Sequence, residues 1–496
     1  MPFGNSNLEM DFSLESEKSG IIEDTVFQIL VLGDWAGSGE RRDLGSRKPI
    51  AIDRDNFDDV LNGLGVRLKL EIAGADVELE FNSLDDFHPD EIYKRVPLFS
   101  ELRELRKRLR NSDTFHSAAR EVREWSGASR EEITEEKQPA EPPSEGLLDA
   151  ILSSPDGGGR APKPAISSDL SALVGELVRP HLLTVDEGEQ ASMVAAVDEA
   201  TSSLMRSILH DRRFQQLEAA WRGLFFLVRR TETSSESKIF ILDVTKDELE
   251  ADLRTGDDIT DSVLFKRITR GRDSEPWAAT FGNYAFMPSV DDIAALIRLG
   301  KIGAAANTPF VSHIRPNVLG VTSLAEHPNS DGWDLTGNAN EGKLWAALRG
   351  MPESRYIGLT MPRFLVRLPY GSATEPTEVF AFEEFTEGHD HDKYLWANPC
   401  FVVANLLAIT YTELGWDFGS RFYQDVDGLP LHMYQKNGET IYQPCGEVLL
   451  SQNAAEKLLE YGIMPIVTFK NSDRIRLARF QSISDPPTVL RVRRSG

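Results

Sequence analysis

The sequence predicts an α+β fold of mixed sheets with packed helices, in which a disordered linker joins a small domain to a large one. Its 496 residues are enough for two or three domains, and 41% of them are hydrophobic, which gives each domain a core. Apolar residues recur with the period of a strand in some segments and of a helix in others. This pattern stops between residues 124 and 168, where Pro, Gly, Ser and Glu dominate. We therefore expect a small domain over 1–123 and a large domain over 169–496.

The first predicted element is a strand over residues 8–15, LEMDFSLE. Leu8, Met10, Phe12 and Leu14 alternate with polar residues, and a period of two places all four on one face. Because the polar segment after them leaves this strand loosely tethered, the strand can pair with a sheet in another molecule. The alternative is a hairpin partner inside its own domain.

The rest of the small domain is predicted to alternate strands and helices. A mostly apolar run over 25–32 is typical of a buried strand. Asp53 or Asp55 can cap a helix over 56–64, because a carboxylate accepts the free amide protons of a first helical turn. The later elements are strands over 68–72 and 77–81 and a helical segment over 88–111.

The linker and the large domain follow. Apolar residues between 124 and 168 are too sparse to offset the entropy lost on ordering, although LLDAIL at 147–152 can form a short helix. The Glu-rich part of this linker is either a solvated spacer or a docking segment. In the large domain, apolar spacing predicts helices over 190–209, 214–229, 246–253 and 289–300 and a strand over 238–244.

The charge balance argues against nucleic acid as a partner. Lys and Arg number 54 against 79 Asp and Glu, a net charge of -25, so we expect no broad phosphate-binding surface. The two cysteines, Cys400 and Cys445, suit a reducing compartment, although counting leaves one disulfide open. The N-terminus lacks a basic leader, and no run approaches the roughly 20 apolar residues that span a bilayer. We expect a cytoplasmic protein without membrane insertion.

Three glycines follow the buried strand and invite comparison with a phosphate-binding loop. Gly33, Gly37 and Gly39 satisfy neither the GxxxxGKS/T pattern nor the GxGxxG pattern. We therefore predict a plain turn that binds no nucleotide.

Two imidazoles and two carboxylates stand together at His389, Asp390, His391 and Asp392. Adjacent His and Asp can ligate a divalent metal, but a closed site needs about four ligands and a supporting shell, and no HExxH motif accompanies them. The sequence favours a polar loop, with a metal site as the alternative.

Other reactive residue types also have structural explanations. Glu383 and Glu384 are neighbours that would point to opposite sides of a strand, which suits a general acid and base pair poorly. Cys400 precedes an apolar run, which predicts a buried small side chain and not a nucleophile. We expect no catalytic residue, no cofactor and no metal. Core or interface anchors are expected at Trp221, Trp345 and Trp396.

Segments of the expected small domain resemble the small subunit (VipA/ImpB-like) of the contractile sheath of bacterial type VI secretion systems. The resemblance covers roughly residues 10–110. Its matching segments are VLGDWAGSGERRDLGSRKP at 31–49, IDRDNF at 52–57 and HPDEIYKRVPLFSELRELRKRL at 88–109.

The expected large domain resembles the large subunit of the same sheath (VipB/ImpC-like). Ordered matches spread over most of the second half are hard to produce by chance. They are RFQQLEAAWRGLFFLVRRTET at 213–233, GNYAF at 282–286, AAANTPFV at 304–311, RYIGLTMPRFLVRLPYG at 355–371, FEEF at 382–385 and YLWANPCF at 394–401.

The resemblance implies a single polypeptide that fuses the two subunits of one building block. Such sheaths are cytoplasmic helical tubes that wind around an inner tube of secreted hexamers and drive it into a target cell by shortening. The resemblance also places LEMDFSLE on a strand donated to a neighbouring protomer, in a helical homo-assembly. Further implied partners are baseplate components and a disassembly ATPase that recognises an exposed helix, for which LLDAIL is the nearest candidate.

The sequence departs from the family near its C-terminal end. The large subunit normally continues well past the segment matching YGIMPIVTFKNSD at 461–473, whereas this sequence stops at Gly496, so we expect a C-terminally shortened large domain. The segment DPPTVLRVRRSG at 485–496 predicts either a short basic strand or a frayed tail.

Three functional hypotheses follow. The first is a self-assembling structural subunit of a contractile sheath, which stores energy for ejection of the inner tube. The second is an accessory or capping adaptor that binds a sheath made of other subunits. The third is a hydrolase that uses the residues at 389–392 or at 383–384.

Overall fold

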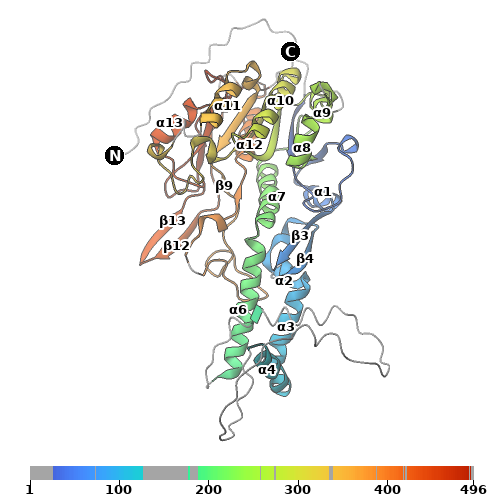
Figure 1. The fold of residues 1–496 in the computed structure, drawn as a ribbon, viewed down its shortest axis with the longest axis vertical. Helices are drawn as coiled ribbons and strands as arrows, with labels where there is room; N and C mark the ends of the chain where they lie inside the picture. The colour runs from blue at the N-terminus through green and yellow to red at the C-terminus, as the bar shows by residue number, and fades with distance from the viewer. Residues whose placement is uncertain are drawn as a thin grey trace, which may run out of the picture. The chain divides into compact units, whose positions relative to one another are not determined.

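The computed structural model of this chain describes residues 26–72, 74–126, 177–178, 188–256, 258–272, 275–333, 339–386, 388–416, 418, 422–490 and 492. The chain divides into two compact units, and Figure 1 shows the helices and strands of each. The first unit comprises Met1–Leu70, Glu78–Glu91 and Leu209–Gly496, and the second comprises Glu71–Val77 and Ile92–Ile208.

A nine-stranded mixed sheet forms the centre of the first unit. Its strand order is β11-β15-β14-β8-β7-β6-β1-β5-β2, and the six strands from β14 to β5 in this order run parallel. At the two ends, β2, β15 and β11 pair antiparallel with their neighbours. The strand bounds are β1 Phe27–Gly33, β2 Ile50–Ile52, β5 Ser237–Asp243, β6 Ala279–Phe286, β7 Phe310–Ile314, β8 Ile357–Met361, β11 Asp425–Val426, β14 Ile463–Thr468 and β15 Ile475–Leu477.

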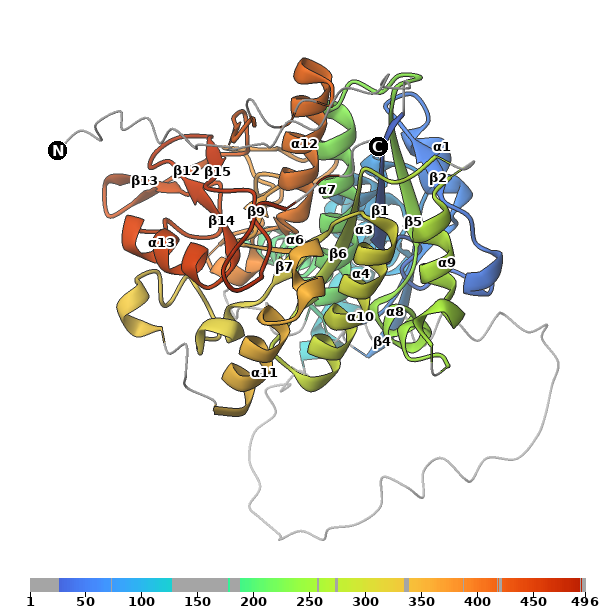
Figure 2. The same ribbon diagram turned by 90° about the horizontal axis from the view of Figure 1, so that it is seen from above.

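Helices cover both faces of this sheet (Figure 2). On one face lie α7 and α12, which contact each other, and α12 also contacts β6 and β7. On the other face, α8, α9, α10 and α11 share one buried apolar core with Leu30 and Leu32 of β1. The bounds are α1 Phe57–Gly63, α7 Arg212–Arg230, α8 Lys246–Leu253, α9 Val263–Arg270, α10 Val290–Ala306, α11 Ala339–Arg349, α12 Cys400–Leu414 and α13 Gln452–Glu460.

β1 lies inside this sheet, between β6 and β5, although both of those strands come much later in the chain. It pairs with β5 along all seven of its residues and with β6 along four. Every residue of β1 is buried, and Phe27 stacks on Tyr411 of α12 with ring centroids 4.4 Å apart. A parallel strand covered on both faces needs a nearly continuous apolar sequence, so the strand predicted over 25–32 is confirmed. Strands from both sides of the expected domain boundary share one sheet, and the boundaries themselves stay a prediction.

Three two-stranded sheets accompany the large one and pair β3 with β4, β9 with β10 and β12 with β13. Along β3, Val66, Leu68 and Leu70 are buried while Arg67 and Lys69 between them are exposed, which is the period of two expected for a strand with one covered face. The bounds are β3 Val66–Ile72, β4 Ala75–Phe81, β9 Phe364–Leu365, β10 Trp396–Ala397, β12 His432–Lys436 and β13 Glu439–Gln443.

The second unit is mainly helical. Within it, α3 packs against α4, and Arg108 Nη2 donates to Glu121 Oε2 at 2.7 Å. Arg106 Nη2 of α3 donates to Asp198 Oδ2 of α6 at 3.0 Å, so ion pairs join all three helices. The bounds are α3 Pro97–Arg110, α4 Ser112–Ser126 and α6 Glu189–Leu209, and α2 Pro89–Arg95 runs from the first unit into the second.

The predicted α+β class of mixed sheets with packed helices is confirmed, and most predicted elements are present. The helical segment predicted over 88–111 is broken between α2 and α3. Val96 is extended there, because the ring of Pro97 disfavours helical backbone in the preceding residue.

The predicted cap of α1 is wrong. Asn56 occupies the N-cap position without a capping side-chain hydrogen bond. Asp53 Oδ1 instead accepts the amide protons of Asp55 and Asn56, each at 3.0 Å, and thereby shapes the turn before the helix.

Several sequence expectations lie outside the described residues. These are the strand at 8–15 with Leu8, Met10, Phe12 and Leu14, the short helix at 147–152 and the part of the predicted linker after residue 126. The first three residues of the predicted linker, 124–126, belong to the end of α4. Among the helices that the structure describes, none combines the length and the apolar character needed to cross a bilayer.

Candidate functional site

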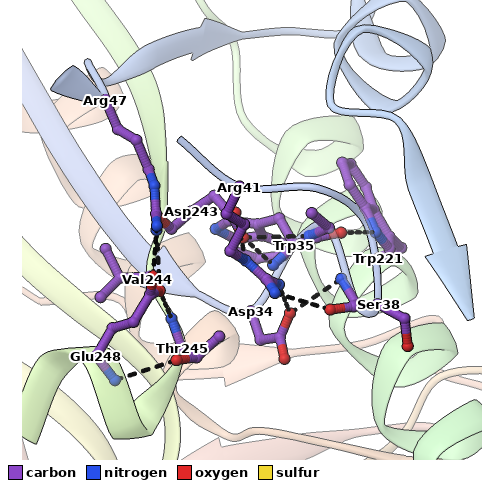
Figure 3. Close-up of polar contacts among 12 residues, drawn as sticks. Asp34, Trp35, Ser38, Arg41, Arg47, Trp221, Asp243, Val244, Thr245 and Glu248 are labelled. Carbon is purple, nitrogen blue, oxygen red and sulfur yellow. Dashed lines mark hydrogen bonds and ion pairs between the residues drawn. The ribbon is translucent and has the colours of Figure 1, made fainter. Parts of the chain in front are cut away.

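The N-terminal segment is joined to the later part of the chain at the carboxyl end of β1. We call this junction the Asp243 junction, after the carboxylate at its centre; Figure 3 shows its polar contacts. The Val244 amide donates to the Gly33 carbonyl at 2.8 Å, which extends the β1–β5 pairing by one more hydrogen bond. After Gly33 the chain turns away from the sheet and its backbone amides need other partners.

Asp243, the last residue of β5, supplies those partners. Its Oδ1 atom accepts the amide protons of Trp35 at 2.7 Å and of Ala36 at 3.1 Å. Its Oδ2 atom accepts from Arg41 Nε at 2.8 Å. One buried carboxylate therefore holds three donors of the N-terminal segment, and hydrogen bonds to an ionised acceptor are stronger than neutral ones.

Arg41 closes the turn after β1. It pairs with Asp34, and its Nη1 donates to the Gly37 carbonyl at 2.8 Å. The Gly37 amide in turn donates to Asp34 Oδ1 at 3.0 Å. Burial raises the pKa of the Asp34 carboxyl and Asp243 adds to this rise, whereas Arg41 opposes it.

A second arginine, Arg47, connects the same segment to the start of α8. Its Nη1 donates to the Asp243 carbonyl at 2.7 Å and to Glu248 Oε2 at 2.9 Å. Glu248 also completes the capping box of α8, whose N-cap is Thr245. It accepts the Thr245 amide at 3.0 Å, while its own amide donates to Thr245 Oγ1 at 3.1 Å. The hydrogen bond from Arg47 lowers the pKa of Glu248 to about 2.

An aromatic contact completes the junction on the α7 side. Trp35 and Trp221 of α7 are fully buried, with ring centroids 5.5 Å apart in an edge-to-face arrangement. Trp221 Nε1 donates to the Trp35 carbonyl at 3.0 Å. Gly37 has φ of +60°, and a Cβ there would lie 2.5 Å from the Arg67 carbonyl oxygen, so the turn requires glycine.

The charged groups of the Asp243 junction pair with one another, which is the chemistry of an attachment between segments. A second buried ion cluster follows the same rule. Arg367 Nε donates to Glu218 Oε1 of α7 at 2.9 Å, and its Nη1 donates to Glu384 Oε2 at 2.8 Å. Burial by itself would raise the pKa of Glu384, but Arg367 overrides it and lowers the pKa to about 2.

The predicted glycine loop is the turn at the Asp243 junction. Gly37 makes the turn, as expected, while Gly33 ends β1. What the sequence did not reveal is that the backbone amides of Trp35 and Ala36, between these glycines, donate to Asp243 of β5.

The predicted His-Asp loop does not bring its side chains together. His389 stacks on Tyr434 with ring centroids 3.5 Å apart, whereas His391 Nε2 lies 3.4 Å from Glu447 Oε1. Asp390 caps a short 3-10 helix. Over the described residues, no group of three or more His, Cys, Asp and Glu side chains is placed to hold a metal ion.

The paired glutamates diverge as expected, but not on a strand. Glu384 is buried against Arg367, and Glu383 Oε1 accepts from the Ser372 hydroxyl at 2.6 Å. Cys400 is buried and free, as is Cys445. Burial raises the pKa of the Cys400 thiol well above its ordinary value, which disfavours a nucleophilic thiolate.

Sequence reasoning missed the main residues of the Asp243 junction. Asp34 pairs with the nearby Arg41, but the roles of the others depend on partners about 200 positions away, which no local spacing encodes. A weak signal existed, since the charged residues Asp34, Arg41 and Arg47 all lie in the segment that follows a strand buried on both faces. The missed residues are Asp34, Trp35, Arg41, Arg47, Asp243 and Glu248.

Substitution Asp243→Ala should lower the free energy of unfolding by about 2–4 kcal/mol, because it leaves the buried amides of Trp35 and Ala36 without an acceptor. Urea denaturation followed by circular dichroism measures the change. The matched control is Asp425→Ala, which removes a surface pair with Arg476 and should cost below about 1 kcal/mol. Equal losses in the two variants would contradict the role given to Asp243.

The Arg47–Glu248 pair should make the free energy of unfolding depend on pH. The pKa of Glu248 falls from 4.5 to about 2 on folding, so the pair stabilises the fold above about pH 4.5 and loses this contribution as the pH falls toward 2. Glu248→Gln should therefore cost about 1 kcal/mol at pH 7 and almost nothing near pH 2, after allowance for solvent screening. Urea midpoints over this range test the difference, and Arg47→Gln should give the same pH profile. A deficit that stays constant down to pH 2 would exclude this explanation.

Comparisons with known proteins agree with the two segments joined at this site. Residues 191–484, more than half of the chain, match the family model described as VipB, EvpB/VC_A0108, tail sheath N-terminal domain. Residues 7–124 match the model described as type VI secretion system, VipA, VC_A0107 or Hcp2.

A relative in Pseudomonas aeruginosa PAO1 carries the name type VI secretion system sheath protein TssC1. It is 37% identical over 305 residues, which are 60% of this chain and 61% of the relative. This chain thus spans less than two thirds of that protein. With both family models matched in one polypeptide, the chain belongs to the type VI secretion tail sheath family and is a fusion of its small and large subunits.

Proposed function

We propose that this chain is a structural subunit that assembles with copies of itself into a contractile sheath around an inner tube and stores energy for ejection of that tube. The observation that carries the proposal is the placement of β1, from the VipA-like segment, between β5 and β6 of the VipB-like segment. A protomer that transmits force needs its parts to move as one body, and a shared central strand provides this.

The covalent fusion has a physical advantage for such an assembly. It fixes the ratio of the two segments at one to one, and the linker keeps them at a high effective concentration before β1 has paired. Because the junction charges are satisfied by one another, the proposal assigns the chain a mechanical role and no catalytic one.

Contacts between protomers need a separate element. We assign this role to the strand at 8–15, whose apolar residues Leu8, Met10, Phe12 and Leu14 would pair with a neighbour's sheet. The inner-tube hexamer, baseplate components and a disassembly ATPase are further proposed partners in the cytoplasm. Main-chain pairing between protomers resists separation while leaving their relative angle adjustable, which contraction requires.

Deletion of residues 1–18 should abolish assembly without unfolding the protein, since β1 begins only at Phe27. Negative-stain electron microscopy of the full chain, alone and with inner-tube protein, should show tubes, rings or short filaments that the deletion lacks. Circular dichroism and the melting temperature report whether the fold survives.

A sharper pair of variants separates the apolar face of this strand from its polar face. Replacing Leu8, Met10, Phe12 and Leu14 with Ser should block assembly, whereas replacing the polar Glu9, Asp11 and Ser13 with Ala should not. Loss of folding in the deletion would place the strand inside its own domain, and a full-length protein that stays monomeric under all conditions would refute the sheath proposal.

A further inference from the structure

A pocket of about 410 Å³ lies beside the β12–β13 hairpin. This volume lies within the range of about 300–1,000 Å³ that is usual for ligand sites, and it has room for a long side chain. The pocket includes one histidine of the predicted His-Asp loop and shares no residue with the Asp243 junction. Six of its twelve lining residues are Tyr370, Glu383, Phe385, His389, His432 and Tyr434.

Five of these six residues carry aromatic rings. His389 stacks on Tyr434 at an angle of 17° between ring planes, and Phe385 lies 5.2 Å from the His389 ring. Burial lowers the pKa of His389, aided by Lys436, and burial also lowers the pKa of His432 to about 4. Both imidazoles are therefore neutral at neutral pH, so they line the pocket with uncharged rings instead of positive charge.

One wall carries a carboxylate in a fixed position. Glu383 Oε1 accepts from the Ser372 amide at 2.9 Å and from its hydroxyl at 2.6 Å. A Cβ at position 371 would lie only 2.3 Å from Glu383 Oε2, so Gly371 gives the carboxylate its room. Aromatic faces beside an oriented carboxylate match a guanidinium, which stacks on rings and donates in a planar fork to carboxylate oxygens.

We propose that this pocket binds an arginine side chain supplied by a second copy of the chain, from the basic segment RVRR at 491–494. Charge complementarity supports this occupant. Glu383 gives the pocket a carboxylate, and Arg491, Arg493 and Arg494 follow closely on one another directly after the buried Leu490. The inference rests on the proposed self-assembly for the source of the arginine.

Binding of a labelled peptide to unassembled protein tests the assignment. The receptor is the full chain with Arg491, Arg493 and Arg494 replaced by Gln, so that its own segment does not compete. The probe is the peptide LRVRRSG, and fluorescence anisotropy should show it binding at least about tenfold more tightly than LQVQQSG. The lysine peptide LKVKKSG should bind more weakly than the arginine peptide, because lysine lacks the planar fork.

Two matched variants on the β12–β13 hairpin test whether the arginine peptide binds in the pocket. Tyr434→Leu should weaken the arginine peptide about tenfold, whereas Tyr442→Leu should leave it unchanged. Tyr442 is exposed, does not line the pocket and lies on the hairpin face opposite Tyr434. Phe385→Leu should act like Tyr434→Leu, and the melting temperature of each variant shows that it is folded.

Two results would overturn the assignment. One is equal binding of the arginine and glutamine peptides, and the other is arginine-peptide binding that a folded Tyr434→Leu variant does not weaken. If Phe385→Leu unfolds the protein, the Tyr434→Leu variant alone tests the assignment, because Tyr434 is partly exposed. Sheath-like tubes that form while the arginine peptide fails to bind would refute the pocket and leave the proposed function standing. Arginine-dependent binding that Tyr434→Leu weakens would support the pocket whether or not tubes form.

Discussion

The position of β1 in the middle of the nine-stranded sheet is the constraint on which the rest of the structure depends. A central parallel strand bonds to a neighbour on each side, and β1 pairs with β5 along seven residues and with β6 along four. Its side chains also join both helical layers, since Phe27 meets α12 while Leu30 and Leu32 enter the core shared with α8 to α11. Without β1, two strands would lose their partners inside the sheet and expose unpaired backbone groups.

The Asp243 junction follows from this placement. Where a central strand ends, the chain turns away from the sheet, and the backbone amides at that turn need hydrogen-bond acceptors. Asp243 accepts from the backbone amide of Trp35, and Trp221 donates to the Trp35 carbonyl, so both hold that turn in place. Arg41 and Arg47 neutralise the carboxylates that lie beside it. The VipA-like segment is thereby locked in register as well as in place, because a slip of one residue would face every side chain of β1 to the wrong layer. A structural subunit of a sheath fits this double attachment, in which backbone pairing and the junction both hold β1 in the sheet.

Local patterns in the sequence predicted the elements of this fold better than their partners. The apolar run at 25–32 predicted a buried strand correctly, because a strand that is buried on both faces needs apolar side chains at nearly every consecutive position. Which sheet that strand enters depends on β5 and β6, far along the chain, and no periodicity contains this information. The same limit applies to Glu384. The sequence shows that Glu383 is its neighbour, but it does not show that Arg367 binds Glu384 and links it to Glu218. The ring stack of His389 on Tyr434 likewise depends on a hairpin that arrives later in the chain.

Cleavage of the linker in the folded protein tests the central claim most directly. A specific protease site inserted after Ser153, outside the described residues, allows the backbone to be cut after folding. If β1 is a central strand of the shared sheet, the two fragments should co-elute as a one-to-one complex on gel filtration with an unchanged circular dichroism spectrum, and should separate only in denaturant. Fragments that separate in native buffer while each keeps its fold would show that the two segments are independent domains and would contradict the account.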